Sequence, residues 1–269
     1  MAGMRPLRPL LLALLVVGLS WFEFGQPLTA KALIQRVADA FDPRPTRRIL
    51  ILGNSRTYFH DMPDMVRAMA DSARDRQRLD ITLDALPGGT FERLWCDTGT
   101  QSYLSQRWDD VILQGESRGQ ATEPLSRSFQ TYGARLIAAA HLTSGKLRLV
   151  VNWNYEAKVW GDSDPDGSGR AAYFSAIQSG TAALGNRAGA RLVNIGQLWG
   201  QVAAAHPNIA LTEDGNHPTL AGSYLFGLLL YADLSGKDIR MVTYVPNDLD
   251  VSTAATLRQA VRDYQTFTL

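Results

Sequence analysis

Short apolar runs alternate with helical patterns along most of the chain, and this alternation constrains the fold more than any other feature of the sequence. The apolar runs cover residues 48–52, 81–86, 111–113, 147–151 and 191–195. The helical patterns that separate them cover residues 62–78, 91–106, 124–141 and 171–188. Strands that alternate with helices form βαβ units, which build a mostly parallel sheet covered on both faces. We therefore expect an α/β fold, a three-layer α/β/α sandwich.

The N-terminal segment has the pattern of an export signal. Arg5 and Arg8 precede an apolar run over residues 10–19, which is shorter than the roughly 20 residues that a membrane span needs. Ala30-Lys31-Ala32 supplies a small-x-small cleavage site. We predict a signal peptide over residues 1–32, a linker over 33–46 and one folded domain over 47–269. An uncleaved membrane anchor and a buried N-terminal helix are the alternatives.

Charge and cysteine content exclude several classes of function. The 27 Lys and Arg residues nearly balance the 26 Asp and Glu residues, so no basic field exists to attract nucleic acid. Small neutral or mixed-polarity substrates fit this balance better. Cys96 is the single cysteine and cannot form an intramolecular disulfide. Its place in a helical pattern predicts a buried, unreactive thiol.

Polar residues follow the predicted strands at the points where functional groups collect in a parallel sheet. The carboxyl ends of the strands carry Gly53-Asn54-Ser55, Pro87-Gly88-Gly89-Thr90, Gln114-Gly115-Glu116-Ser117 and Asn152-Trp153-Asn154. A late loop carries Asp214-Gly215-Asn216-His217-Pro218. Ligands of open α/β sheets bind outside these strand ends. A functional site is therefore expected at the carboxyl ends of these strands.

Ser55, His217 and Asp214 have the residue types of a nucleophile, its base and the acid that orients the base. A serine is a poor nucleophile until a base removes its proton. His217 follows Asp214 by three residues, a spacing that allows the carboxylate to accept from the imidazole Nδ1–H. The alternatives are a helix cap for Ser55, a polar turn for Asp214 and a surface position for His217.

These blocks, in this order, resemble the SGNH (GDSL-like) serine hydrolases. Residues 51–55, Ile-Leu-Gly-Asn-Ser, are similar to the family's Gly-Asp-Ser turn, with Asn54 in place of aspartate. Gly88 matches the glycine of the second block, and Asp214 and His217 match the Asp-x-x-His of the last block. The resemblance spans residues 48–234. It implies a flavodoxin-like SGNH hydrolase fold with Ser55, Asp214 and His217 as the catalytic triad.

The third block departs from the family pattern. Gln114-Gly115-Glu116-Ser117 stands where the family has a Gly-x-Asn-Asp whose asparagine donates to the oxyanion. This Gln-Gly-Glu resembles a variant found in carbohydrate acetylesterases of the superfamily. The resemblance predicts an oxyanion hole made by Gln114 with the backbone N–H groups of Ser55 and Gly88. The alternatives are turn glycines at 88 and 89 and ordinary polar residues at the strand end.

The remaining polar residues at the strand ends are expected to line the pocket. These candidate pocket residues are Asn54, Gly89, Glu116, Asn152 and Asn154. Asn152 and Asn154 also come next as oxyanion donors if Gln114 does not serve.

The resemblance implies an exported serine esterase, secreted or periplasmic, that needs neither a cofactor nor a metal. Its expected partner is a small-molecule or carbohydrate ester with a short acyl group such as acetyl. The aromatic residues near the strand ends suggest the carbohydrate; they are Trp95, Trp153, Tyr155 and Trp160. No nucleic acid is expected, and the membrane is contacted only if the N-terminal segment stays uncleaved. The alternatives are an O-acyltransferase that uses the same triad and a catalytically silent binding protein that keeps the fold.

Overall fold

A computed structural model of the protein describes residues 39–268. The contacts divide the chain into a first unit that ends at Pro45 and a second that begins at Thr46. The second unit contains the sheet and all the candidate site residues. The predicted signal peptide, residues 1–32, and the part of the predicted linker before residue 39 lie outside the described residues.

Within the described residues, one five-stranded sheet forms the centre of the second unit, and every strand pair in it is parallel. The strands are β1 (Thr46–Gly53), β2 (Arg78–Ala85), β3 (Trp108–Leu113), β4 (Ser144–Val150) and β5 (Arg191–Val193). Their order in the sheet is β2-β1-β3-β4-β5. This is the flavodoxin-like order of a doubly wound sheet, in which the direction of winding reverses between β1 and β3. The predicted α/β fold is confirmed.

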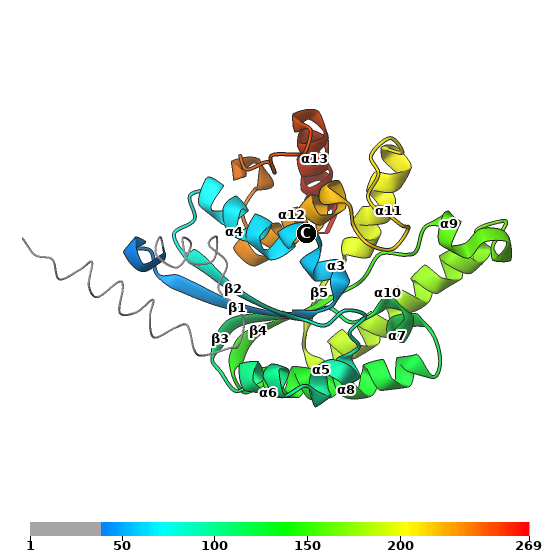
Figure 1. Cartoon of the computed structure of the whole chain (residues 1–269), viewed down its shortest axis with the longest axis horizontal. Helices are drawn as coiled ribbons and strands as arrows, with labels where there is room; N and C mark the ends of the chain where they lie inside the picture. Colours follow the sequence, from blue (N-terminus) through cyan, green and yellow to red (C-terminus); the bar gives the residue numbers. More distant parts are fainter. Residues whose placement is uncertain (1–38, 269) are drawn as a thin grey trace, which may run out of the picture. The chain divides into compact units, whose positions relative to one another are not determined.

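Helices cover both faces of the sheet and complete the three layers (Figure 1). One face carries α4 (Met62–Ser72), α11 (Ile195–Ala205), α12 (Leu220–Ser235) and α13 (Val251–Thr268). The other carries α5 (Phe91–Cys96), α6 (Thr98–Leu104), α7 (Ser117–Ala121), α8 (Leu125–His141) and α10 (Ser168–Ala188). The short elements are α3 (Ser55–Tyr58), η2 (Phe59–Asp61), α9 (Ala157–Trp160), η3 (Gly161–Ser163) and η4 (Ile239–Met241).

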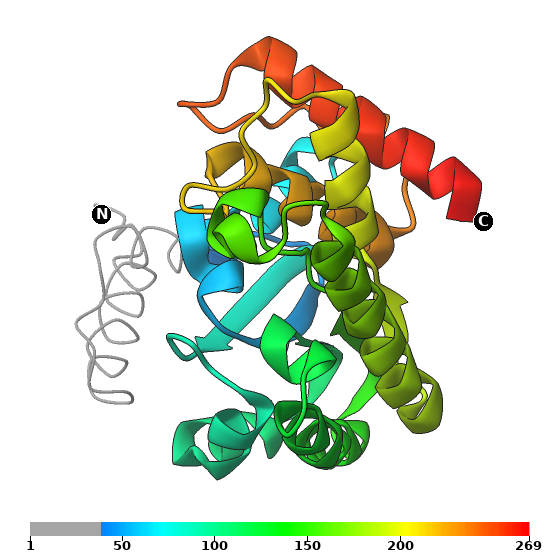
Figure 2. The same ribbon diagram turned by 90° about the vertical axis from the view of Figure 1, so that its right-hand side faces the viewer.

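The central strand β1 is buried on both faces, because successive side chains of a strand point to opposite sides. Ile49 and Ile51 belong to the core beneath α4, α11, α12 and α13. Leu50 and Leu52 belong to the core beneath α5 and α8. The first core is the larger of the two, and it is closed by α13, which packs on α11 and α12 (Figure 2).

Helix α12 is apolar around nearly its whole circumference because α4 packs on it from one side and α13 from another. No helix between residues 39 and 268 combines the length and the apolar character that a membrane span requires.

Two predicted helices have different limits in the structure. The pattern over residues 62–78 ends as a helix at Ser72, and Arg78 already begins β2. The pattern over 91–106 is two helices, because the side chain of Asp97 accepts a hydrogen bond from the N–H of Thr100 at 2.9 Å and starts a new helix. Cys96, predicted to be buried, is exposed at the end of α5.

Candidate active site

The candidate site residues lie where the winding of the sheet reverses. Ser55 follows β1, and Gln114 follows β3, the strand paired with β1. Gly88 follows β2 on the other side of β1. The loop that carries Asp214 and His217 reaches the same edge from the segment before α12. The fold therefore brings together residues that lie up to 162 positions apart in the sequence.

The structure joins Ser55, His217 and Asp214 in one chain of hydrogen bonds. The Nε2 atom of His217 lies 3.0 Å from Oγ of Ser55. Its Nδ1 atom lies 2.6 Å from Oδ2 of Asp214. With Nδ1 protonated and donating to the carboxylate, Nε2 is left to accept the serine proton. The three residues have the geometry of an activated nucleophile.

Asp214 is held ionised by its surroundings. Partial burial raises its pKa, but the His217 side chain and the backbone N–H groups of His217 and Asn216 lower it further than burial raises it. The two N–H groups donate to Oδ1 at 2.7 and 2.8 Å, which leaves Oδ2 for the imidazole. The net result is a pKa well below the ordinary range of aspartate, so Asp214 is a carboxylate wherever the protein is folded near neutral pH.

The segment around α9 contacts the loop that carries Asp214 and His217, which we call the catalytic loop because it carries the candidate acid and base. The N–H of Glu156 donates to the carbonyl of Gly215 at 2.9 Å, and Nζ of Lys158 donates to the carbonyl of Glu213 at 3.2 Å. Gly215 has φ of +90°, and a side chain there would also collide with Val159. Only glycine fits this turn, which explains the residue that follows Asp214.

Asn54 caps helix α3, so Ser55 does not. Oδ1 of Asn54 accepts from the N–H of Arg56 at 3.1 Å, and Nδ2 donates to the carbonyl of Gly89 at 3.2 Å. Ser55 is the first helical residue, and its N–H has no acceptor within the helix. The alternative of Ser55 as the helix cap is thereby excluded. Its hydroxyl faces His217 and its N–H is free of helix bonding.

Gly88 and Gly89 form a turn beside Ser55. Gly88 has φ of +59°, and the N–H of Gly89 closes the turn by donating to the carbonyl of Leu86 at 2.8 Å. A Cβ at Gly89 would lie only 2.8 Å from that carbonyl oxygen. The turn therefore uses the N–H of Gly89 internally, and Gly88 remains the candidate donor of this pair.

The side chain of Gln114 is not oriented to donate to an oxyanion, and this corrects the sequence-based prediction. Its side chain is fully buried, and Nε2 donates to Oδ1 of Asn152 at 3.0 Å and to the carbonyl of Gly115 at 2.6 Å. Its Oε1 accepts from the N–H of Asn54 at 3.1 Å. Both amide hydrogens are thus used inside the protein. Gln114 links the ends of β1, β3 and β4 instead of facing a substrate.

The other predicted pocket residues are mostly structural as well. Nδ2 of Asn152 donates to the carbonyl of Gly115 at 2.6 Å and to Oε1 of Gln120 at 3.1 Å, and the side chain is fully buried. Nδ2 of Asn154 donates to the carbonyl of Arg170 at 2.7 Å. Glu116 is half-buried beside Arg118, and burial raises its pKa against the lowering effect of that arginine. Of the five predicted pocket residues, Asn54 belongs to the turn that carries Ser55, and Gly89 contacts that turn by accepting from Nδ2 of Asn54.

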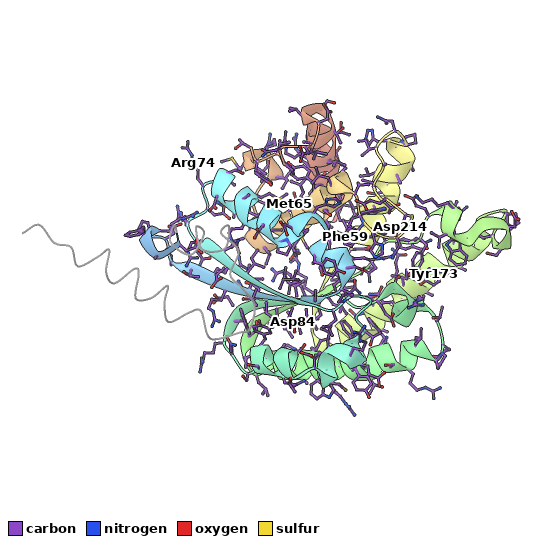
Figure 3. All side chains as sticks on the ribbon, in the orientation of Figure 1. Phe59, Met65, Arg74, Asp84, Tyr173 and Asp214 are labelled. Atoms are coloured by element: carbon purple, nitrogen blue, oxygen red, sulfur yellow. The ribbon has the colours of Figure 1, made fainter. Side chains whose placement is uncertain are left out.

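Arg56, Asn216 and Phe59 contact the site, and sequence reasoning missed all three. Arg56 donates to Asn216 from Nε at 3.1 Å and from Nη2 at 2.7 Å. The ring of Phe59 stacks on the imidazole of His217, with centroids 4.7 Å apart and planes inclined by 10°. Phe59 and Asp214 lie on the same side of the second unit, away from Arg74 (Figure 3). The sequence did place Arg56 directly after Ser55 and Asn216 directly before His217, and this proximity could have marked both as candidate site residues. Phe59 lies four residues after Ser55 and had no such mark.

The described residues contain no group of three or more His, Cys, Asp or Glu side chains placed to hold a metal ion.

Comparisons with known proteins find likeness in structure alone. No family model and no curated protein matches the sequence. One similar solved structure is a protein from Slackia heliotrinireducens that has been provisionally assigned to the SGNH hydrolases. It has 27% identity and a TM-score of 0.54, and the match covers 70% of this chain and 99% of that one.

Two further solved structures are similar at lower identity. A DUF4886 family protein from Bacteroides uniformis has 13% identity and a TM-score of 0.64, with 83% of this chain and 96% of that chain covered. An acetylxylan esterase from Geobacillus stearothermophilus has 13% identity and a TM-score of 0.54, with 75% and 96% covered. The chain has the SGNH (GDSL-like) hydrolase fold.

Proposed function

We propose that this protein is a serine esterase with Ser55 as nucleophile, His217 as base and Asp214 as the acid that orients the base. The observation that carries the proposal is the continuous contact from Ser55 Oγ to His217 Nε2, at 3.0 Å, and from His217 Nδ1 to Asp214 Oδ2, at 2.6 Å. Few arrangements of side chains serve acyl transfer as directly as this one.

The proposed reaction proceeds in two steps. His217 takes the proton of Ser55 as Oγ attacks the ester carbonyl, and the protonated imidazole then gives that proton to the departing alcohol. Water attacks the acyl-enzyme in the second step, with His217 again accepting a proton and returning it to Ser55 as the acid leaves. Asp214 stabilises the imidazolium in both steps without accepting the proton itself.

The proposed oxyanion hole consists of backbone N–H groups. One donor is the N–H of Ser55, the first residue of helix α3. The other is the N–H of Gly88, which belongs to the neighbouring turn after β2. A preorganised donor of this kind contributes on the order of 3–4 kcal/mol to transition-state stabilisation. Gln114 is left out of this hole because both of its amide hydrogens are donated elsewhere.

The proposed substrate is a short-chain acyl ester of a carbohydrate. Tyr155, Trp160 and Tyr173 form a partly exposed aromatic cluster next to Arg56, with Tyr173 5.4 Å from Trp160 and 6.0 Å from Tyr155 between ring centroids. Partly exposed aromatic faces suit stacking on sugar rings, although the polar atoms Nε1 of Trp160 and Oη of Tyr173 are buried. Trp153 is not part of this surface, because it is buried and stacked on Trp199.

Export of the protein remains a proposal from the sequence. Arg5, Arg8 and the apolar run over residues 10–19 support it. The test is N-terminal sequencing of the protein recovered from the medium or periplasm of an expressing bacterium. Cleavage after Ala32 supports the signal peptide, and an intact N-terminus in the membrane fraction supports an anchor instead.

The test of the esterase proposal combines a covalent probe with turnover. A fluorophosphonate is expected to label the protein, peptide mapping is expected to place the label on Ser55, and a short-chain aryl ester is expected to be hydrolysed. Ser55→Ala should lose both activities. Ser175→Ala, a change at an exposed serine on α10, is the matched control and should retain both. Absence of labelling in the folded wild-type protein favours a silent binding protein.

Product analysis separates hydrolysis from acyl transfer. With an acetylated oligosaccharide and an unmodified oligosaccharide present together, an esterase releases free acid in proportion to substrate consumed. An acyltransferase moves the acyl group to the unmodified sugar, and little acid appears.

A further inference from the structure

Arg56, the residue that follows the proposed nucleophile, has a buried guanidinium. Arg56 follows Ser55 in helix α3 and is only 4% exposed. Among the described residues it has no carboxylate within ion-pair distance, and burial lowers its pKa to about 10. Burying a charge without an opposite charge is costly unless hydrogen bonds replace its water. Burial of the Arg56 guanidinium is therefore costly in free energy, and this costly group lies next to the proposed active site.

The hydrogen bonds of Arg56 connect three separate segments of the site. Nε and Nη2 donate to Oδ1 of Asn216, at 3.1 and 2.7 Å, and Nη1 donates to the carbonyl of Trp153 at 2.7 Å. The guanidinium also lies over the rings of Trp153 and Tyr155, 4.5 and 5.2 Å from their centroids. Arg56 thus ties the helix of Ser55 to the loop after β4 and to the catalytic loop.

Asn216 passes this constraint on to His217. Its N–H donates to Asp214, its carbonyl accepts from Trp153 Nε1 at 3.0 Å, and its Nδ2 lies 3.4 Å from Nε2 of His217. Arginine has donors and no acceptor, so the amide oxygen of Asn216 must face Arg56. The amide nitrogen must then face the imidazole. Nε2 meets a donor and is favoured as an unprotonated acceptor.

We propose that Arg56 is a positioning residue for the proposed base: through Asn216 it fixes the amide orientation that keeps Nε2 of His217 unprotonated and directed at Ser55. A protonated Nε2–H facing the Asn216 amide would set donor against donor. Without Arg56 the amide is free to rotate and present its oxygen to Nε2, which favours the imidazolium. Arg56 acts on the base and not on the substrate, since its side chain is closed off from solvent.

Several charged and titratable groups surround His217, and they approach from each neighbouring element. Asp214 accepts from Nδ1, and Ser55 faces Nε2. His60 of η2 lies 3.0 Å from Glu213 and 3.2 Å from the carbonyl of Pro218. The groups next to the loop of Asp214 and His217, from α9, η2 and the loop itself, are Glu156, Lys158, His60 and Glu213. All of these remain in place in the variants below. Arg56→Met also removes a positive charge near His217 and Asn216→Asp adds a negative one, so Arg56→Lys, which keeps the charge, separates the effect of charge from that of the Asn216 amide.

The inference rests on the proposed function only for its kinetic readout, because the protonation of His217 can be followed directly. ¹⁵N NMR of labelled protein reports which imidazole nitrogen carries the proton, and His217→Gln assigns the signal. We expect Nδ1 protonated and Nε2 bare in the wild type. Arg56→Met and Asn216→Asp are both expected to move the midpoint of this titration upward by about one pH unit or more, since each lets an acceptor face Nε2.

The kinetic readout distinguishes positioning from a loss of folding. The acidic limb of kcat/KM is expected to shift upward with the NMR midpoint in both variants. Arg56→Lys, which keeps the charge but loses the two-pronged contact, should lower kcat by roughly 10- to 100-fold with KM changed by less than about threefold. Asn216→Asp keeps Arg56 and places a carboxylate oxygen where Arg56 donates, so it keeps the test valid if Arg56→Met fails to fold.

Arg148→Lys is the matched control, because Arg148 is similarly buried but pairs with Asp110 and Asp233 away from the site. It should lower the thermal midpoint and leave the titration unchanged. Midpoints of Arg56→Met and Asn216→Asp that stay within about 0.3 pH unit of the wild type overturn the inference. Wild-type protein that shows the NMR behaviour but no turnover contradicts the esterase proposal and leaves the role of Arg56 standing.

Discussion

Asn54 caps the helix that begins at Ser55, with its Oδ1 atom 3.1 Å from the N–H of the residue after the serine. The two functions that a serine can have after a strand are therefore divided between neighbouring residues. Asn54 satisfies the helix terminus, and the Ser55 hydroxyl is free to face His217. This division makes the contribution of Ser55 to chemistry separable from its contribution to folding.

Ser55→Ala is expected to abolish hydrolysis of a short-chain aryl ester while changing the free energy of unfolding by less than about 1 kcal/mol. The small effect on stability follows because the cap on α3 belongs to Asn54. Denaturant unfolding and initial rates measure the two quantities. Residual activity near the wild-type level would place the nucleophile elsewhere.

Asp214→Asn is expected to lower kcat by about 10⁴-fold at neutral pH, the effect that the same change has in a well-studied serine protease triad. An amide in this position no longer enforces the tautomer in which Nδ1 carries the proton. The measurement is kcat across pH 5 to 8, with circular dichroism to show that the fold is kept. A loss below tenfold would mean that Asp214 does not orient the base.

Asp214 is expected to add no ionisation to the kcat/KM profile above about pH 4, because the pKa of this carboxyl lies below its ordinary value in the folded protein. A depressed folded pKa means that the stability it contributes is present above the unfolded value and is lost as pH falls toward the folded one. The profile should therefore rise through a single ionisation, that of the base. Two acidic limbs between pH 4 and 8 would contradict this.

Gln114→Ala is expected to act on stability before it acts on catalysis. It leaves the N–H of Asn54 and the Oδ1 atom of Asn152 unpaired in the interior, at a cost of roughly 1–3 kcal/mol for each group. Gln201→Ala, at an exposed position of α11, should cost less than about 0.5 kcal/mol and serves as the control. If Gln114→Ala kept full stability but lost kcat, the original assignment of Gln114 to the oxyanion would be restored.

Phe59→Leu is expected to lower kcat by about two- to tenfold, because stacking of aromatic rings contributes roughly 0.5–1.5 kcal/mol beyond burial. The ring restricts rotation of the His217 imidazole, and leucine keeps the volume without the flat face. Phe59→Tyr keeps the face and should retain most of the activity. Equal losses in both variants would argue against the stack.

The sequence by itself was enough for the architecture and for the three central residues. Strands buried on both faces, such as 48–52, appear as continuous apolar runs. Their alternation with helical patterns leaves few topologies other than a parallel sheet with helices on both faces. A parallel sheet places the ends of its strands at one edge, so Ser55 and the loop of Asp214 and His217 were predicted to meet there. The pairing of Asp214 with His217 could be predicted from local spacing, because the two residues lie three positions apart.

The tertiary structure alone decided how the polar side chains around this centre are oriented. Gln114 has the same amide whether it faces an oxyanion or Asn152, and its neighbours in sequence do not reveal which. Arg56 appears as an ordinary surface arginine until the fold brings Asn216 and Trp153 to it from distant segments. A hydrogen bond depends on the position of both partners. Sequence fixes which groups are able to donate, and only the packed chain determines what stands opposite each donor.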